Sequence, residues 1–258
     1  MKQKAGYDKR YYKFIATPSL DSARVMLPFV VSALEPRSVC DFGCGAGAWL
    51  RVWKELGVTD IVGVDGDYVD RNSLLIAREE FIAADLTKEI RLGRQVDLAC
   101  SLEVAEHLPP KFAEVLVHTL TRHASRVLFS AAVPGQGGYQ HINERPLEYW
   151  RELFAQRRYA AFDFLRPKLL GLTGIERWYA LNTMLYVAVD AAESLPDQVF
   201  KTRVKPEESL KDFTPVGFRL RKTLLRRLPV HCVNLLHSVK KRAVLCRRAP
   251  KLGLGSGL

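Results

Sequence analysis

The stretch VCDFGCGAGAW, from Val39 to Trp49, contains a short apolar run, an acid and then three glycines at alternate positions. The helical pattern AWLRVWKEL follows it, so the order is typical of a buried strand, a tight turn and a helix. Gly43, Gly45 and Gly47 carry no Cβ, and a ligand can therefore approach the backbone of the turn closely. The stretch predicts a strand–turn–helix unit that binds a nucleotide-like ligand.

The alternation of strand and helix continues along the first 190 residues. Short apolar or β-branched runs predict seven strands: SVCDF, DIVGVD, EEFIAAD, VDLACSL, RVLFSAA, AAFDFLRP and TMLYVAVD. Helical spacing predicts helices at AWLRVWKEL, PKFAEVLVHTLTRHA and LEYWRELFAQRR. We expect an α/β fold with a Rossmann-like, doubly wound and mostly parallel seven-stranded sheet that carries helices on both faces.

The net charge of +11 belongs to the C-terminal part of the chain. Residues 201–258 hold 15 basic and 3 acidic side chains, which leaves 24 basic and 25 acidic in the first 200 residues. We predict a folded domain over residues 1–193, followed by a linker and a basic, amphipathic helical tail over residues 194–258. Such a tail suits an anionic membrane surface, and a solvated tail or a helix docked on the domain is the alternative. The near-neutral body argues against nucleic acid as a partner.

Cysteine usage and hydropathy indicate the compartment. No window reaches the roughly 18 apolar residues of a spanning helix, and the N-terminus has a basic start without an apolar core. The cysteines lack metal-ligand spacing and suit reduced thiols: Cys40, Cys44, Cys100, Cys232 and Cys246. We therefore expect a cytoplasmic protein, peripheral at the inner membrane surface if the tail binds there.

Two kinds of nucleotide ligand fit the glycine turn. Gly43, Gly45 and Ala48 satisfy the dinucleotide pattern G-x-G-x-x-G/A, which is a weak signal by itself. Asp41 lies two residues before the first glycine, where a carboxylate is unfavourable beside a pyrophosphate. The same carboxylate attracts the cationic ammonium end of S-adenosylmethionine. The acid therefore favours S-adenosylmethionine as the cofactor.

Four motifs in order now resemble those of the class I S-adenosylmethionine-dependent methyltransferases, over roughly residues 11–190. DFGCGAG is similar to the first motif of that family, VGVDGDY to the second, AADL to the third and SLEVAEHLPP to the fourth. A narrower resemblance is to the bacterial group that includes ubiquinone-biosynthesis and sugar-modifying enzymes.

The resemblance implies a set of cofactor-binding residues: Asp41, Gly43, Gly45, Gly47, Asp65, Asp85, Leu86, Leu102 and Glu103. Within this set, Asp41 would lie near the methionine amino group and Asp65 would accept the ribose hydroxyls. Asp85 would lie near the adenine amino group. Alternatives stay open, since Asp67 could replace Asp65 and Asp85 could only cap the segment after it.

Methyl transfer to a hydroxyl calls for a base, and the candidates follow the fourth and fifth predicted strands. His141 is the first choice, because it lies in the glycine-rich loop GQGGYQHINE and imidazole titrates near neutral pH. Glu103, Glu106 and His107 are further catalytic candidates. The alternatives are a loop histidine that only binds backbone, and a structural role for Glu106 and His107 at a helix start.

We therefore predict a methyltransferase that modifies a hydroxyl of a sugar, a polysaccharide precursor or a small metabolite, without a metal. A second hypothesis rests on Glu103, Glu106, His107 and His141. They resemble the Glu-x-x-Glu-His plus distal His constellation with which small-RNA 3′-terminal 2′-O-methyltransferases bind a divalent ion. A third hypothesis is a non-catalytic subunit that binds the cofactor.

Overall fold

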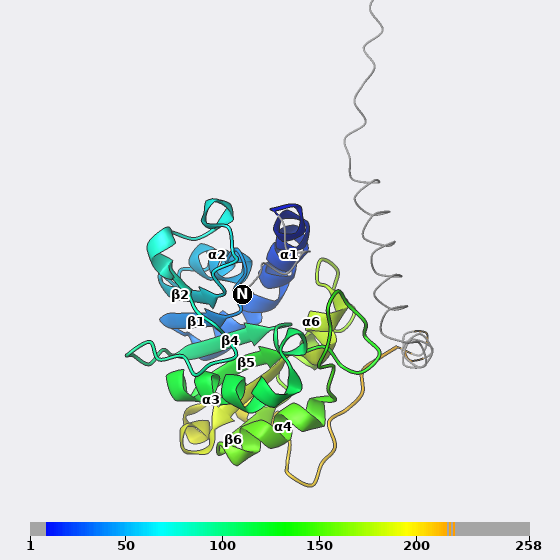
Figure 1. Cartoon of the computed structure of the whole chain (residues 1–258). Helices are drawn as coiled ribbons and strands as arrows, with labels where there is room; N and C mark the ends of the chain where they lie inside the picture. Colours follow the sequence, from blue (N-terminus) through cyan, green and yellow to red (C-terminus); the bar gives the residue numbers. More distant parts are fainter. Residues whose placement is uncertain (1–8, 216, 218, 220–258) are drawn as a thin grey trace, which may run out of the picture.

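The structure is a computed structural model, and it describes residues 9–215, 217 and 219 (Figure 1). In this part of the chain, seven strands form one sheet in the order β3-β2-β1-β4-β5-β7-β6. All neighbouring strands pair in parallel except β7, which is antiparallel to both β5 and β6. The strands are β1 (Ser38–Phe42), β2 (Asp60–Asp65), β3 (Phe81–Ala83), β4 (Leu98–Leu102), β5 (Arg126–Ser130), β6 (Tyr159–Phe162) and β7 (Met184–Ala188). The predicted mostly parallel sheet is confirmed.

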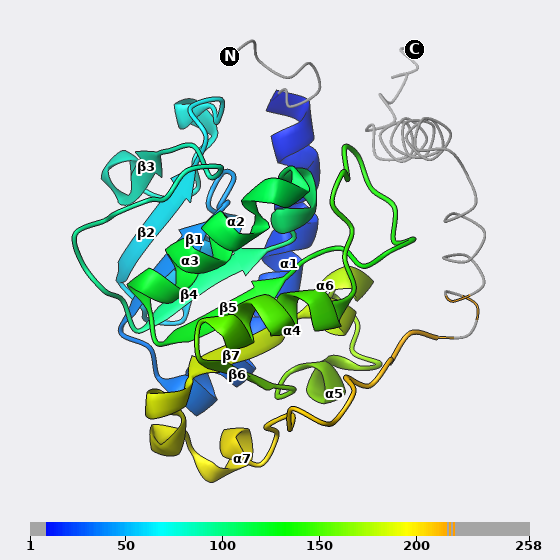
Figure 2. The same ribbon diagram turned by 60° about the horizontal axis from the view of Figure 1, so that its bottom comes forward.

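Helices cover both faces of the sheet, and Figure 2 shows α3 and α4 in front of it and α1 behind it. The helices are α1 (Lys9–Leu34), α2 (Ala48–Glu55), α3 (Ala113–His123), α4 (Leu147–Gln156), α5 (Arg166–Leu169), α6 (Arg177–Asn182) and α7 (Asp197–Phe200). Successive strand residues face opposite sides. Val39 therefore joins the core formed with Leu27 and Trp53, whereas Cys40 joins the core formed with Leu116 and Trp150. The predicted Rossmann-like arrangement with helices on both faces is confirmed.

Helix α1 is not predicted by the sequence pattern, because Pro18 and Pro28 lie inside it. The helix forms because its inner face is buried, with Met26 fully excluded from solvent. On its outer side the guanidinium of Arg24 donates two hydrogen bonds of 3.1 Å to the carboxylate of Glu55 in α2. Tertiary packing therefore outweighs the local cost of the prolines.

The first residues beyond the predicted domain boundary pack on the domain. The N–H of Val204 donates to the carbonyl of Ala161 over 2.9 Å, and the carbonyl of Thr202 accepts from the N–H of Asp163 over 2.9 Å. This segment thus extends the edge of the sheet at β6. The division between residues 193 and 194 stays a prediction.

Three cysteines are buried free thiols, as the sequence predicts: Cys40, Cys44 and Cys100. Cys232 and Cys246, together with the predicted amphipathic helix around them, lie outside the described residues. Within the described residues, no helix combines the length and the apolarity that a membrane crossing requires. The cytoplasmic location stays a prediction.

The direction of the strands places the functional segments. The strands β1 to β6 all run the same way, so their C-terminal ends lie along one border of the sheet, here called the carboxyl edge. Strand β7 runs the opposite way and begins at this edge. The loops that leave β1, β2, β4, β5 and β6 therefore meet there.

Candidate functional site

The glycine turn leaves β1 at the carboxyl edge with three left-handed backbone angles. The φ values of Gly43, Gly45 and Gly47 are 92°, 54° and 84°, where residues with a side chain are strained. A Cβ at Gly43 would overlap the side chain of Val104, and a Cβ at Gly47 would lie 3.0 Å from Ile76. The neighbouring loops therefore leave no room for a side chain at Gly43, and at Gly47 a Cβ would require the side chain of Ile76 to shift.

Asp41 is the acid that precedes the turn, and it is only 2% exposed. Burial, and then the negative charge of Asp65, raise the pKa of Asp41 to about 8. A buried carboxyl of this kind gains from a cation beside it. This is the electrostatic setting that the sequence predicts for the ammonium group of the cofactor.

Asp65 ends β2, and its carboxylate holds the glycine turn. It accepts from the N–H of Gly45 over 2.7 Å, from the N–H of Gly66 over 2.6 Å and from the hydroxyl of Tyr68 over 2.6 Å. Burial raises the pKa of Asp65, and these three donors oppose that rise. The carboxylate thus lies directly beside the turn, whereas the alternative candidate Asp67 is exposed.

Asp85 and Leu86 follow β3. One carboxylate oxygen of Asp85 accepts from the N–H of Thr87 over 3.0 Å and from its hydroxyl over 2.6 Å. These hydrogen bonds lower the pKa of Asp85, which is exposed, whereas Leu86 is buried. One of the two carboxylate oxygens of Asp85 therefore caps the residues after it, as the alternative predicts. Its role at the adenine stays a prediction.

Glu103 follows β4 directly after the buried Leu102, and its φ of 56° is unusual for a residue with a side chain. The amide of Gln136 donates to its carboxylate over 2.8 Å, and the amide of Asn182 donates over 3.4 Å. Burial raises its pKa, and these donors oppose the rise. Gln136 and Asn182 are functional candidates that the sequence analysis missed, because nothing in their local patterns relates them to Glu103.

Glu106, His107 and His141 come together although the last two are 34 positions apart in the sequence. One possible ligand atom from each lies within 4.8 Å of the others. Nε2 of His141 is 4.0 Å from Oε1 of Glu106, and the two imidazole rings stack edge to face with centroids 4.9 Å apart. Three of the four predicted catalytic residues, from the loops after β4 and after β5, therefore form one cluster, which does not include Glu103.

The carboxyl group of Glu106 is fully buried, and neither of its oxygens forms a hydrogen bond in the described part of the chain. Burial, and then the charge of Glu103, raise its pKa well above the ordinary value. A buried carboxyl without donors must either keep a proton or face a cation.

Backbone contacts hold the two loops of the cluster against each other. The carbonyl of Glu106 accepts from the N–H groups of Ile142 and Asn143 over 2.9 and 3.0 Å. The side chain of Asn143 donates to the carbonyl of Ala105 over 3.2 Å and accepts from Arg145 over 2.9 Å. Asn143 therefore joins the loop after β5 to the loop after β4.

Comparison with known proteins identifies the family to which the chain belongs. Residues 20–178 match the family model described as "Methyltransferase domain". The chain belongs to this methyltransferase family. The match covers more than half of the chain, from α1 into α6, and it includes the glycine turn and the cluster. The dinucleotide alternative is thereby set aside.

Solved structures show the same fold at low sequence identity. A putative O-methyltransferase from Nostoc punctiforme has a TM-score of 0.50 and 15% identity, over 69% of this chain and 58% of that one. The methyltransferase domain of the bacterial protein CtHen1 has a TM-score of 0.49 and 18% identity, over 66% and 98%. Magnesium protoporphyrin IX methyltransferase from Synechocystis, with bound S-adenosylmethionine, has a TM-score of 0.47 and 18% identity, over 73% and 86%. At these identities the likeness shows the fold alone. No curated protein sequence matches the chain, and the narrower resemblance to ubiquinone and sugar enzymes gains no support.

S-adenosylmethionine is the cofactor of this methyltransferase, and the acids at the carboxyl edge fit it. Asp41 and Asp65 are both buried, and their negative charges oppose each other. The cofactor carries an ammonium and a sulfonium group, so a positive charge beside the pair would relieve the repulsion. A pyrophosphate in the same place would increase it.

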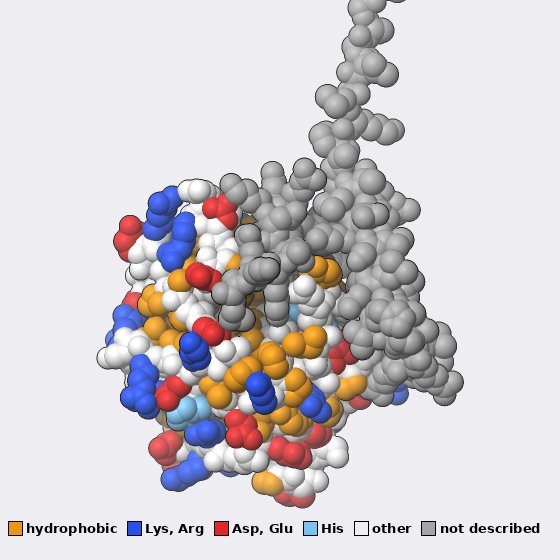
Figure 3. All heavy atoms as spheres, in the orientation of Figure 1, with side chains coloured by type: hydrophobic (Ala, Val, Ile, Leu, Met, Phe, Trp, Pro, Cys, Tyr) orange, Lys and Arg blue, Asp and Glu red, His pale blue; other side chains and the backbone are white. Residues whose placement is uncertain are grey.

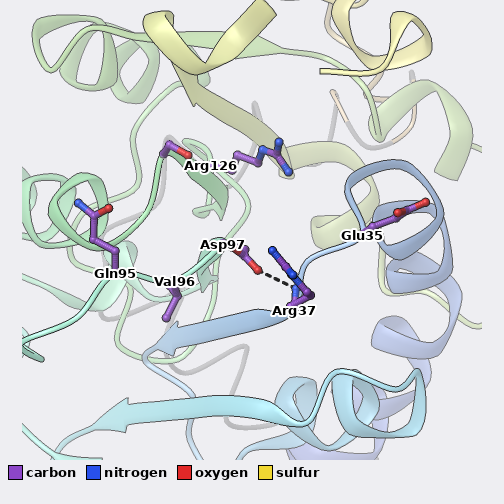
Figure 4. A pocket seen from close by; sticks show the side chains of 7 residues that line it. Glu35, Arg37, Gln95, Val96, Asp97 and Arg126 are labelled. Atoms are coloured by element: carbon purple, nitrogen blue, oxygen red, sulfur yellow. Dashed lines mark hydrogen bonds between the residues drawn. The ribbon is translucent and has the colours of Figure 1, made fainter. Parts of the chain in front are cut away.

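A polar cavity of about 390 Å³ lies at the opposite edge of the sheet, away from this site (Figure 4). Asp97, which lines it, accepts from the N–H groups of Arg37 and Ser38 over 2.8 and 3.1 Å. The guanidinium of Arg126 donates to the carbonyl of Leu34 over 3.2 Å. These contacts hold the connections at the N-terminal ends of β1 and β5, so the side chains of Asp97 and Arg126 have structural partners.

Proposed function

We propose that this methyltransferase methylates a hydroxyl group of a sugar, a polysaccharide precursor or another small metabolite, and that His141 accepts the hydroxyl proton. The observation that carries the proposal is the position of His141. Its side chain is only 12% exposed, and its Nε2 faces the cluster at the carboxyl edge. An imidazole held there can accept a proton from an acceptor hydroxyl.

The cofactor-binding part of the proposal assigns one role to each acid. Asp41 attracts the ammonium group, Asp65 accepts the ribose hydroxyls and Asp85 accepts from the adenine amino group. The remaining members of the set shape the walls: Gly43, Gly45, Gly47, Leu86, Leu102 and Glu103. Support comes from the burial of Asp41 and from the direct contact of Asp65 with the turn.

The chemistry balances without any further reactant. When bound, S-adenosylmethionine supplies an electrophilic methyl group on a sulfonium sulfur that leaves with the electron pair of the carbon–sulfur bond. The acceptor oxygen forms the new bond to carbon while its proton passes to Nε2 of His141. The protein contributes the alignment of the reacting atoms and the removal of the proton. In this proposal, Glu103, Glu106 and His107 form the polar surroundings of that nitrogen.

The choice of a small acceptor rests on charge. The first 200 residues hold 24 basic and 25 acidic side chains. On the face shown in Figure 3, basic and acidic side chains of the described residues are interspersed. A surface of this kind has little attraction for a phosphate backbone.

The test is transfer of labelled methyl groups into a fractionated bacterial extract. The expected result is label in the glycan or small-molecule fraction, a loss of at least about a hundredfold in His141→Ala, and no effect of a chelator. His118→Ala is the matched control, since this partly exposed histidine on α3 lies outside the cluster. Label only in protein or nucleic acid would refute the proposed acceptor. Unchanged function of His141→Ala in cells would favour the non-catalytic hypothesis.

The second candidate function is metal-dependent 2′-O-methylation of RNA. The specific observation in its favour is the cluster of Glu106, His107 and His141, because a carboxylate and two imidazoles are good ligands for a divalent ion. In that function the ion would lower the pKa of the ribose hydroxyl. Label in RNA that a chelator abolishes and Mn²⁺ restores would establish it and displace the first candidate.

A peripheral contact with anionic membrane belongs to the same proposal, since residues 201–258 hold the whole excess of basic over acidic side chains. Each basic side chain near such a surface contributes around 1 kcal/mol. In a flotation assay with anionic vesicles, the full chain should rise with the lipid, and a chain that ends at residue 219 should not. Equal retention of both would contradict the contact.

A further inference from the structure

The loop that carries His141 is organised around one carboxylate. Glu144 accepts from the N–H of Gly135 over 2.8 Å and from the N–H of Gly137 over 2.7 Å. It also lies 3.0 Å from Nδ1 of His141, and its side chain is 19% exposed. Three groups of the loop therefore converge on a single side chain.

The glycines of the loop make this convergence possible. Gly135 and Gly137 have φ values of 81° and 68°, which residues with side chains rarely adopt. A Cβ at Gly138 would overlap the imidazole of His141. The absence of a side chain at Gly138 thus gives the ring of His141 its place against the backbone of the loop.

The chemistry of Glu144 settles which nitrogen of His141 carries the proton. Burial raises the pKa of Glu144, but the hydrogen bonds from His141 and from the two glycine amides outweigh it, so that the net shift is downward. An ionised carboxylate can only accept hydrogen bonds. In the neutral imidazole, Nδ1 must then be the donor, and Nε2 keeps its lone pair towards the cluster.

We propose that Glu144 is a positioning residue that holds His141 in the tautomer with hydrogen on Nδ1, so that Nε2 is free to accept a proton. This inference rests on the proposed function of His141 as a base. Glu144 itself touches neither acceptor nor cofactor in this proposal. It acts by orienting the ring and by fixing the conformation of the loop around it.

The decisive variant is Glu144→Gln, which keeps the shape of the side chain. An amide nitrogen cannot accept, so in the position of Oε1 it gives up the hydrogen bond from Gly137 and donates to Nδ1. The hydrogen of the imidazole then moves to Nε2, which removes the basic lone pair. We expect methyl transfer to fall at least about a hundredfold, as it does when a buried acid that orients a catalytic histidine becomes an amide. The dissociation constant of S-adenosylhomocysteine should stay within about twofold. Glu152→Gln is the matched control, because Glu152 is exposed on α4.

The direct readout is the imidazole itself. Long-range proton–nitrogen NMR spectra of the ¹⁵N-labelled protein with S-adenosylhomocysteine report which ring nitrogen carries hydrogen. The expected result is hydrogen on Nδ1 of His141 in the wild type and on Nε2 in Glu144→Gln. Hydrogen on Nε2 in the wild type, or an unchanged tautomer together with full activity in Glu144→Gln, would overturn the proposal.

A second variant covers the case in which Glu144→Gln does not fold. Glu144→Asp keeps an acceptor-only side chain that is one methylene shorter, so it should keep hydrogen on Nδ1 and recover part of the activity. Loss of the Nδ1 tautomer in a folded Glu144→Asp protein would count against the proposal. The tautomer is measured without an acceptor, and this separates the inference from the proposed function. If His141→Ala kept full methyl transfer, the role of the base would fail while the tautomer could still be as inferred.

Discussion

The carboxylate of Asp65 lies 2.7 Å from the backbone nitrogen of Gly45, so the end of β2 and the glycine turn after β1 form one structural unit. The other oxygen of the same carboxylate accepts from the hydroxyl of Tyr68 over 2.6 Å. A residue proposed to receive ribose hydroxyls thus already receives a phenolic one. A ribose bound by Asp65 as proposed would share or replace this contact.

Replacing Asp65 and Tyr68 should therefore have opposite effects on cofactor affinity. Asp65→Asn is expected to weaken the binding of S-adenosylhomocysteine at least about tenfold, because a charged acceptor and part of the support of the turn are lost. Tyr68→Phe should strengthen binding about two- to fivefold, because a competing donor disappears. Isothermal calorimetry checks both, and weaker binding by Tyr68→Phe would show that its hydroxyl takes part in the complex.

Asp41 should make the stability of the cofactor-free protein depend on pH. Its folded pKa of about 8 lies above the ordinary value near 3.9, so the folded protein binds this proton more tightly than the unfolded chain. Stability is then fully present below about pH 4 and is lost as the pH rises towards 8. We expect urea unfolding to show a decrease of more than about 1 kcal/mol between pH 6 and pH 8.5.

The variant Asp41→Asn tests the origin of that decrease. It should reduce the slope and stabilise the free protein at pH 8.5, while weakening cofactor binding. The exposed Asp67 provides the control, since Asp67→Asn should leave the slope as it is. An identical slope in Asp41→Asn would assign the effect to another group.

A pair of glycine variants separates backbone strain from steric overlap. Gly43 and Gly57 share a φ of 92°, but a Cβ would overlap Val104 only at Gly43, whereas no atom lies within 4 Å of a Cβ at Gly57. Gly57→Ala should cost the strain alone, about 1 kcal/mol, and Gly43→Ala at least about 2 kcal/mol more. Chemical denaturation measures both.

The part of the stability cost of Gly43→Ala that comes from steric overlap should be relieved by a second substitution. In a Val104→Ala background, the additional cost of Gly43→Ala is expected to shrink, because the overlapping methyl groups are gone. If the two variants were simply additive, the cost at Gly43 would come from its backbone angle or from another neighbour.

Glu106 should tolerate loss of its charge. Its carboxyl is buried without hydrogen bonds and its pKa is well raised, so the neutral amide of Glu106→Gln resembles the form already present. We expect the free energy of unfolding to change by less than about 1 kcal/mol or to increase. A large loss of stability that appears only when Mn²⁺ is present during the measurement would instead identify a bound cation, as in the second candidate function.

The sequence predicts the strands well because their signals are local. SVCDF and DIVGVD coincide with β1 and β2, where continuous apolar runs end in an acid or a glycine turn. EEFIAAD overestimates β3, because only Phe81–Ala83 finds a partner at the edge of the sheet. Helix α1 is not predicted from the sequence, because its two prolines argue against a helix locally and the burial of its inner face in the core stabilises it.

The residues of the site also divide into those that the local sequence predicts and those that depend on tertiary contacts. The glycine turn, Asp41 and Asp65 can be predicted, because their spacing along the chain fixes their place at the end of a strand. The amide contacts of Gln136 and Asn182 with Glu103 cannot, because they join loops separated by 33 to 79 positions. Their geometry depends on how those loops fold back over the carboxyl edge.

The antiparallel strand β7 has a consequence for the order of assembly. It lies between β5 and β6, and Asn182 reaches Glu103 from the residues just before it. A nascent chain that has emerged only as far as β6 therefore has the cofactor turn, His141, Glu144 and Gln136. It still lacks the strand between β5 and β6 and the second amide that donates to Glu103, that of Asn182. During synthesis on the ribosome, the half of the sheet with β1 to β4 can form first, and the half with β5, β6 and β7 becomes complete only when the chain has emerged past Ala188.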